Sequence, residues 1–208
     1  MPEALRDIPV NLIIGRRGAT KGAVVAGFLG GRPAGSRWAA LYNDLAPDAS
    51  TEAAPRGVYI NRLADGCICC SAQAGLRVAL TRLLREARPQ RLLIEPSSQA
   101  HIQPLLQLLA DRWLAPVLEV RATVLVIDGA HHVDGGFSDL DRQRMCHADI
   151  IAFHGVDGEQ ATAACGLLSD LRKFAPAARL VTTANDLPDP GLLDLPGRII
   201  RPRFHSDG

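Results

Sequence analysis

The sequence has no marked excess of either charge and no hydrophobic run long enough to cross a membrane. Its 208 residues include 23 basic and 22 acidic side chains, for a formal net charge of +1. So balanced a chain lacks the broad basic character that polyanion binding favours, and nucleic acid is not an expected partner. No apolar run approaches the roughly 20 residues that span a bilayer, and no charged segment followed by an apolar one opens the chain. We therefore expect a cytoplasmic protein that binds neither nucleic acid nor membrane.

Lysine and cysteine are scarce, so their positions are informative. Lys21 and Lys173 are the only lysines among the 23 basic side chains. The five cysteines are odd in number, and three of them, Cys67, Cys69 and Cys70, lie within four positions. This pattern does not suit a disulfide framework. In a reducing compartment it indicates metal binding or redox chemistry.

The remaining composition, with 47% hydrophobic and 22% charged residues, is that of a globular chain, and the length suits a single domain spanning residues 1–208. Apolar runs of strand length alternate with amphipathic stretches of helix length. This alternation predicts an α/β fold with a mostly parallel sheet flanked by helices on both faces. The expected strands are 10–14, 38–42, 58–60, 91–95, 120–128, 150–153, 180–183 and, as an edge, 198–201. The expected helices are 21–29, 76–87, 102–114, 138–147 and 159–174.

Polar residues follow many of the predicted strands. In open parallel sheets, ligands bind beyond the carboxyl ends of the strands. We therefore expect the polar residues at these ends, together with the first glycine-bearing turn, to converge on one edge of the sheet. They are Asn43, Asp44, Glu95, Ser97, Ser98, Asp128 and His154.

The segment Gly15 to Gly22, GRRGATKG, follows the first predicted strand and opens the first predicted helix. Backbone N–H groups and the helix start in such a place point at a bound phosphate, so the candidate nucleotide-binding residues here are Gly15, Gly18, Thr20, Lys21 and Gly22. The Walker A pattern asks for glycine, four residues, a second glycine, lysine and a hydroxyl residue. Gly15 and Lys21 are correctly spaced, but Thr20 replaces the second glycine and Gly22 replaces the hydroxyl residue that binds Mg²⁺. A turn that uses its glycines only for bending is the alternative.

The segment Gly66-Cys67-Ile68-Cys69-Cys70 is the most specific motif in the chain. Thiolates exposed together on one turn bind Zn²⁺, another thiophilic divalent ion or Cu(I). Three sulfur ligands require a fourth group, and water, Glu95, a histidine or a second subunit would serve. Buried structural cysteines and a redox pair are the alternatives, but such close clustering favours metal binding.

In order and spacing, these motifs resemble the CobW-like metal-binding GTPases, relatives of the HypB and UreG nickel-maturation proteins. That family has a P-loop, a strand ending in Asn-Asp/Glu-Phe-Gly, a Gly-Cys-x-Cys-Cys motif, a strand ending in Glu followed by Ser-Gly or Thr-Gly, and a guanine-reading Asn-Lys-x-Asp. This chain has, in the same order, Gly15 to Lys21, Asn43-Asp44-Leu45-Ala46, the cysteine motif, Glu95-Pro96-Ser97-Ser98 and His154-Gly155-Val156-Asp157. The resemblance covers about residues 10–183. It implies a P-loop NTPase-like fold without the family's usual C-terminal domain.

The nucleotide-handling motifs depart from the family pattern, whereas the cysteine motif does not. Ser98 replaces a glycine, and His154 and Gly155 replace the asparagine and lysine that read the base. By the resemblance, Asp157 would still accept hydrogen bonds from the guanine ring. Losing its neighbours reduces the expected selectivity for guanine.

We therefore expect a zinc-type metal-binding protein that acts in metal homeostasis or metal insertion, with weakened or lost GTP binding and hydrolysis. The expected partners are the metal ion, a nucleotide and a client metalloprotein, and no catalytic residue is assigned. One alternative is an active, metal-regulated GTPase in which Lys21 contacts the phosphates and Asp44 or Glu95 organises Mg²⁺. Another is a non-catalytic pseudo-GTPase that pairs with an intact paralogue.

Several further side chains are weaker candidates. Each imidazole is a possible metal ligand by its chemistry, but His131-His132 more simply forms a solvated loop pair and His101 begins a surface helix. Cys146 and Cys165 are expected to be small core residues on helices. The pair Arg16-Arg17 either grips phosphate or is simply exposed.

Overall fold

The fold is built on one parallel sheet. The computed structural model describes residues 5–43, 56–63, 73–132, 136–154, 161–182 and 189–197. The strands are β1 Ile8–Gly15, β2 Trp38–Tyr42, β3 Val58–Arg62, β4 Arg91–Glu95, β5 Leu118–Val120, β6 Val124–Asp128, β7 Ile150–His154 and β8 Arg179–Thr182. They lie in the order β3-β2-β4-β1-β6-β7-β8, with β5 also paired to β1. All of the named strand pairs are parallel, as the sequence predicted.

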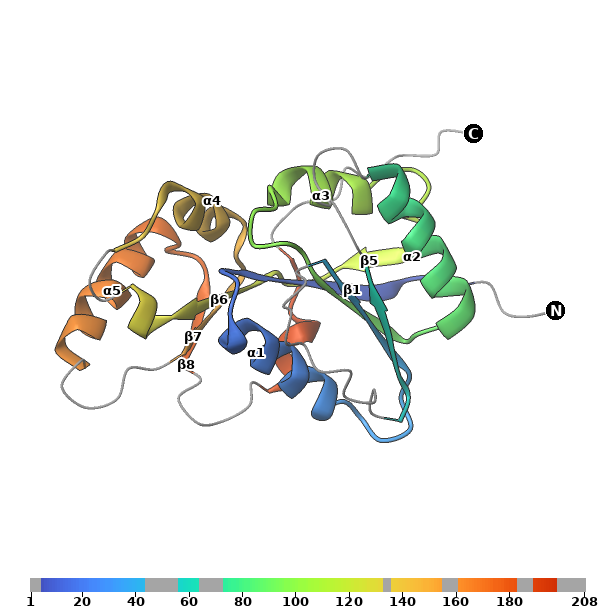
Figure 1. Cartoon of the computed structure of the whole chain (residues 1–208), viewed down its shortest axis with the longest axis horizontal. Coiled ribbons are helices and arrows are strands. Elements are labelled where there is room, and N and C mark those ends of the chain that lie inside the picture. Colours follow the sequence, from blue (N-terminus) through green and yellow to red (C-terminus); the bar gives the residue numbers. More distant parts are fainter. Residues whose placement is uncertain are drawn as a thin grey trace.

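Helices cover both faces of this sheet (Figure 1). They are α1 Ala19–Gly30, α2 Gln73–Ala87, α3 Ile102–Leu109, α4 Asp139–His147 and α5 Ala161–Phe174, with short 3-10 helices η1 Gly129–His131 and η3 Pro190–Asp194. Apolar side chains of α2, α3, α4 and α5 share one buried cluster, and those of α1 and η3 share another. The two-faced arrangement that the sequence predicted is confirmed.

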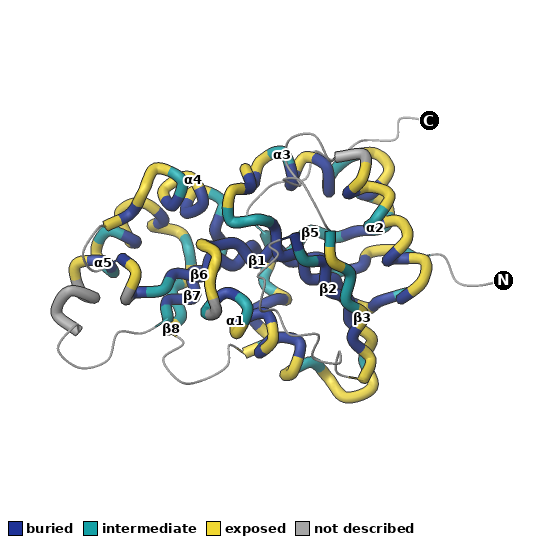
Figure 2. The backbone as a smooth tube through the Cα atoms, in the orientation of Figure 1, coloured by how far each residue is buried: buried dark blue, intermediate teal, exposed yellow. Residues whose placement is uncertain are grey.

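The central strands are buried on both sides because their apolar side chains alternate between these two clusters (Figure 2). On β1, Leu12 and Ile14 belong to the cluster beneath α2 to α5, and Ile13 between them belongs to the cluster beneath α1. On β6, Leu125 and Val126 divide in the same way. This explains why these strands read as continuous hydrophobic runs in the sequence.

Two expected elements are wrong. The expected strand 120–128 is two strands, because the backbone N–H of Ala122 donates to Leu195 O, 3.0 Å away, instead of continuing along β1. The expected helix 102–114 ends at Leu109, because the Asp111 carboxylate accepts the backbone N–H groups of Trp113 and Leu114 and starts a separate turn. The expected edge strand 198–201 lies outside the described residues.

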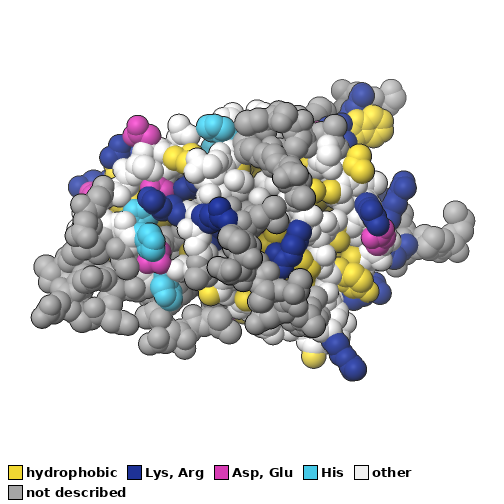
Figure 3. Space-filling view, in the orientation of Figure 1, with side chains coloured by type: hydrophobic (Ala, Val, Ile, Leu, Met, Phe, Trp, Pro, Cys, Tyr) yellow, Lys and Arg dark blue, Asp and Glu magenta, His cyan; other side chains and the backbone are white. Residues whose placement is uncertain are grey.

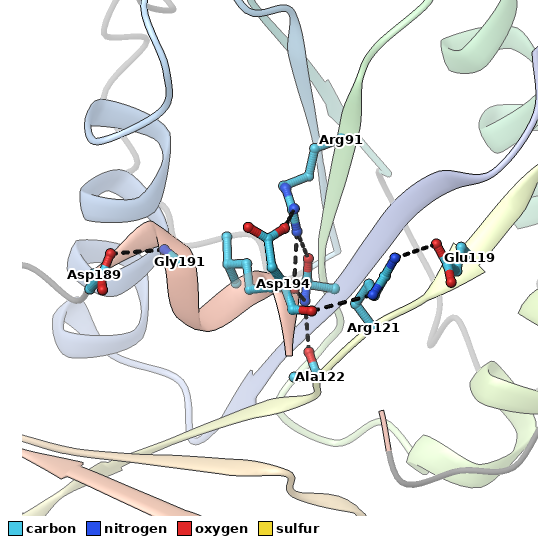
Figure 4. A network of polar contacts seen from close by, with 9 residues as sticks. Arg91, Glu119, Arg121, Ala122, Asp189, Gly191 and Asp194 are labelled. Atoms are coloured by element: carbon cyan, nitrogen blue, oxygen red, sulfur yellow. Dashed lines mark hydrogen bonds and ion pairs between the residues drawn. The ribbon is translucent and has the colours of Figure 1, made fainter. Parts of the chain in front are cut away.

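A buried polar network fastens η3 to the sheet (Figure 4). Asn11 on β1 is fully buried, and its amide donates to Ala122 O and Leu193 O, each 2.9 Å away. Arg91 donates to Asn11 Oδ1 at 2.6 Å and forms an ion pair with Asp194. The buried side chains of Asn11 and Arg91 therefore both have polar partners, as burial requires.

Among the described residues, no helix combines the length and the apolar character that crossing a membrane requires.

Candidate functional site

The glycine-bearing turn leaves the carboxyl end of β1 and enters α1, as predicted. Gly15 lies so close to β6 that a Cβ atom on it would stand 2.7 Å from Val126 O, so a side chain is excluded there. At the start of α1, Gly18 is the N-cap and no side chain caps the helix. The first turn of α1 also carries no acidic residue. The helix start therefore presents uncapped N–H groups beside the turn, as an anion site requires.

Lys21 extends from α1 into the protein and forms an ion pair with Glu95. Its side chain is 2% exposed, and Nζ lies 3.3 Å from Glu95 Oε1 and 3.3 Å from the carbonyl oxygen of Pro96. Glu95 is the last residue of β4 and is also buried. Because β4 is hydrogen-bonded to β1, the two residues meet at the carboxyl edge of the sheet. The lysine that would contact a phosphate is already neutralised by a carboxylate.

Thr20, which stands where the Walker A pattern has glycine, binds the end of β6. Its hydroxyl donates to Asp128 Oδ2 at 2.7 Å. The same carboxylate oxygen lies 3.5 Å from His131 Nδ1. Thr20 therefore ties the start of α1 to β6, and this contact depends on the hydroxyl that glycine lacks.

Gly22 stands where the Walker A pattern has Ser or Thr, but the packing around it does not require a glycine. A Cβ atom built there would meet nothing within 4 Å. The described packing around residue 22 therefore leaves room for a Cβ atom and does not itself require glycine.

Tyr42 and Asn43 border Glu95. Tyr42 pairs with Glu95 in the register of β2 and β4, and the backbone N–H of Asn43 donates to Glu95 O at 2.9 Å. Burial and, second to it, the negative charge of Glu95 together raise the pKa of Tyr42 to about 12, although the positive charge of Arg62 opposes the shift. The phenol therefore stays protonated, and the surroundings of Glu95 hold a neutral hydroxyl.

A second polar cluster, which the sequence did not reveal, joins the turn to α4. Asp141 is 1% exposed; its carboxylate lies 4.0 Å from Arg16 Nη1 and 3.0 Å from Arg144 Nη1. Arg144 also donates to the carbonyl oxygen of Ser98, beyond the end of β4. Ser138 caps α4 through Asp141 in a reciprocal capping box. The spacing Ser-x-x-Asp at 138–141 is the one sequence signal that would have found this cluster.

The histidine and cysteine candidates differ in how far the structure buries them. His131 is exposed, but His132 is 1% exposed, with Nδ1 3.0 Å from Gly136 O, so the two do not form a solvated pair. His101 begins α3 at the surface, as expected. The expectation that Cys146 is a core residue is wrong, because α4 buries its neighbour Met145 and leaves the Cys146 thiol exposed. Cys165 lies on α5, and its side chain is outside the described part.

The structure brings only some of the predicted site residues together. Gly15, Thr20, Lys21 and Glu95 meet at the carboxyl edge, and His154 ends β7 beside Asp128 in register. Figure 3 shows histidine and acidic side chains next to one another on this side of the molecule. The expected residues Asp44, Cys67, Cys69, Cys70 and Asp157 lie outside the described residues. Within the described part, no three His, Cys, Asp or Glu side chains are arranged to hold a metal ion.

A parallel sheet with a glycine turn, an uncapped helix start and a lysine at its carboxyl edge defines a P-loop NTPase-like protein. The sequence profile of the CobW/HypB/UreG nucleotide-binding domain matches residues 9–182. The chain belongs to this family.

Individual relatives agree with this assignment. The chain is 29% identical to the zinc chaperone YeiR of Escherichia coli, over 90% of this chain and 58% of that one. It is 31% identical to the zinc chaperone CobW of a Sinorhizobium species, over 64% of this chain and 40% of that one. In structure it is similar to the Zn(II)-bound YjiA GTPase from Escherichia coli, with a TM-score of 0.67 and 18% identity, over 91% of this chain and 61% of that one. The chain thus spans about half the length of its curated relatives.

Proposed function

We propose that this protein binds a thiophilic metal ion of the zinc type through Cys67, Cys69 and Cys70 and carries it to a client metalloprotein. The observation that supports this proposal most is the intact Gly-Cys-x-Cys-Cys motif at residues 66–70, in a chain whose curated relatives are named zinc chaperones. Thiolates at this spacing provide three of the four ligands that Zn²⁺ takes in tetrahedral sites.

In this proposal, the main role of Glu95 is to pair with Lys21 and not to bind the metal. Its contact with Lys21 supports a part in balancing the charge of the phosphate loop. As the fourth ligand of the metal it stays a prediction, because turning toward an ion would take the carboxylate away from a buried ammonium group.

Zinc titration of the full chain tests this proposal. Zinc is titrated into the reduced chain against a chromophoric chelator, and the wild type is compared with the variant Cys67→Ser/Cys69→Ser/Cys70→Ser. Cys146→Ser is the matched control, because it removes an exposed thiol of α4 that is outside the motif. The proposal expects tight zinc binding to disappear in the triple variant and to persist in Cys146→Ser. If the wild type binds zinc no more tightly than the triple variant, the proposal is wrong.

We further propose that nucleotide binding is weak, because the phosphate loop is occupied by the protein's own groups. A phosphate would compete with Glu95 for Lys21, and Thr20 is held by Asp128. The loop also lacks the hydroxyl that would bind Mg²⁺, since residue 22 is glycine.

The rival candidate is an active, metal-regulated GTPase, which the uncapped start of α1 and the position of Lys21 favour. The variant Thr20→Gly/Gly22→Thr restores the full Walker A pattern, and a Cβ atom at residue 22 would meet nothing within 4 Å. Weak binding in the wild type predicts that this variant binds GTP and Mg²⁺ about tenfold or more tightly than the wild type, as gaining a metal ligand would allow. Metal-stimulated GTP hydrolysis by the wild type that is lost in Lys21→Ala would establish the rival instead.

A further inference from the structure

The outer face of α2 and the turn after α3 form one exposed surface that combines apolar and basic side chains. We call it the α2–turn surface, and it consists of Arg77, Val78, Arg82, Arg85, Arg112 and Trp113. Val78 is 67% exposed and Trp113 is 62% exposed, the two highest values among the large hydrophobic side chains that the structure describes. The side chains of α2 line a shallow hollow of about 640 Å³. Figure 3 shows basic and hydrophobic side chains interspersed at the end of the molecule where α2 lies.

The turn that carries the exposed indole is tied to α2. The Asp111 carboxylate accepts the backbone N–H of Trp113 at 2.8 Å and forms an ion pair with Arg77, which joins the turn to α2. The Arg112 guanidinium lies over the indole, 4.8 Å from the ring centroid. A side chain ordered before binding loses less conformational entropy when a partner covers it. The surface is therefore preorganised for contact.

The α2–turn surface carries more positive than negative charge. Its two acidic neighbours are already engaged, Asp111 with Arg77 and Glu86 with Arg82 at 2.7 Å. Within the described residues, no carboxylate lies at ion-pair distance from Arg85 or Arg112. A partner with carboxylates would complement these two arginines, and an apolar side chain would cover the indole and Val78. Tryptophan and arginine are also the residues that most often dominate binding energy at protein interfaces.

We propose that the α2–turn surface docks an acidic protein segment that also carries apolar side chains. A nucleic acid fits less well, because its affinity depends on a broad basic field and the whole chain carries a net charge of only +1. Only Ser71 and Ala72 separate Cys70 from the start of α2. A client docked on α2 would thus bind next to the cysteine motif along the chain. The role of this surface in metal delivery rests on the proposed function, but the docking itself does not.

The test uses a fluorescein-labelled peptide rich in glutamate with two leucines, titrated with the full chain and followed by fluorescence anisotropy. Trp113→Ala and Arg85→Glu are the test variants. Phe174→Ala is the control for the first, because Phe174 is also an exposed aromatic under an arginine, Arg142, at 5.2 Å. Arg172→Glu is the control for the second, since both arginines are in the last turn of a helix.

We expect each test variant to bind the peptide about tenfold more weakly and each control to stay within about twofold of the wild type. High salt weakens the binding of the wild type, because the contact is partly ionic. Equal losses in the controls would overturn the proposal. Tighter binding of single-stranded DNA than of the peptide, or equal binding of a lysine-rich peptide, would overturn it as well.

A parallel titration separates this proposal from the proposed function. The variant Cys67→Ser/Cys69→Ser/Cys70→Ser should bind the peptide as the wild type does, because no cysteine belongs to the surface. If zinc binding fails while the anisotropy follows the expected pattern, the metal-carrier function is wrong and the docking surface stands. If zinc binds as proposed and the surface variants bind the peptide normally, only the docking proposal falls.

Discussion

The buried ion pair between Lys21 and Glu95 makes a sharp prediction for the variant Glu95→Gln. The substitution preserves shape but removes the carboxylate 3.3 Å from an ammonium group that is 2% exposed. Removing one partner of a buried ion pair leaves a buried charge without its compensation, at a cost of about 3–5 kcal/mol. We therefore expect the free energy of unfolding, measured by urea denaturation, to fall by about that amount.

A matched control is Glu119→Gln. Glu119 Oε2 also accepts from an arginine, Arg121, at 2.7 Å, but both side chains are about one-third exposed. Solvent screens such a pair, so the expected loss is within about 1 kcal/mol. The double variant Lys21→Met/Glu95→Gln removes both charges, and most of the lost stability should return, because the uncompensated charge is gone.

Nucleotide binding by Glu95→Gln provides a second measurement of the same ion pair. Without Glu95 as a competitor, Lys21 is available to an anion, and we expect GTP or pyrophosphate to bind about tenfold more tightly to Glu95→Gln than to the wild type. Saturating anion should also restore part of the lost stability, about 2.7 kcal/mol at a hundredfold excess over Kd. If Glu95→Gln costs no more than Glu119→Gln and GTP affinity does not change, the reasoning about an occupied phosphate loop is refuted.

Three further predictions concern Tyr42 beside Glu95, Arg91 in the network that holds η3, and Ser138 at the start of α4. The pKa of Tyr42 is about 12 in the folded protein, whereas the phenol of the unfolded chain ionises near pH 10, so the free energy of unfolding should fall by about 2–3 kcal/mol between pH 10 and 12. Urea titrations should show a smaller decline in Tyr42→Phe than in the wild type. An identical decline in the two proteins would contradict the shift. Arg91→Met removes the donor to the buried Asn11 Oδ1 and should lower stability by about 2–3 kcal/mol and expose η3 to limited proteolysis; unchanged digestion would contradict the role of the network in holding η3. Ser138→Ala removes the cap of α4 and should cost about 1 kcal/mol in thermal denaturation, whereas a neutral result would mean that the capping box contributes nothing.

The order of strands and helices could be predicted from the sequence because each central strand is buried on both faces. Continuous apolar runs such as 91–95 therefore stand out between amphipathic stretches. The break between β5 and β6 could not be predicted in this way. It depends on the hydrogen bond between Ala122 and Leu195, residues more than 70 positions apart, and no local pattern encodes such a contact.

The candidate site was predictable in its position but less so in its internal contacts. Strand ends of a parallel sheet meet at one edge, so the convergence of Glu95 with the glycine turn followed from the expected topology. That Glu95 would pair with Lys21 did not follow, because both side chains had other plausible partners in a metal or a nucleotide. The contacts of Asp141 with Arg16 and Arg144 come from the packing of α4, which hydrophobic periodicity does not specify.

The most direct test of the central claim is X-ray absorption at the zinc edge on the reduced chain loaded with one equivalent of zinc. Coordination by the cysteine motif predicts three sulfur atoms at about 2.3 Å from the metal and one lighter ligand. The sulfur shell should vanish in Cys67→Ser/Cys69→Ser/Cys70→Ser. A first shell made only of nitrogen and oxygen in the wild type would contradict the claim that this protein holds zinc through its clustered thiolates.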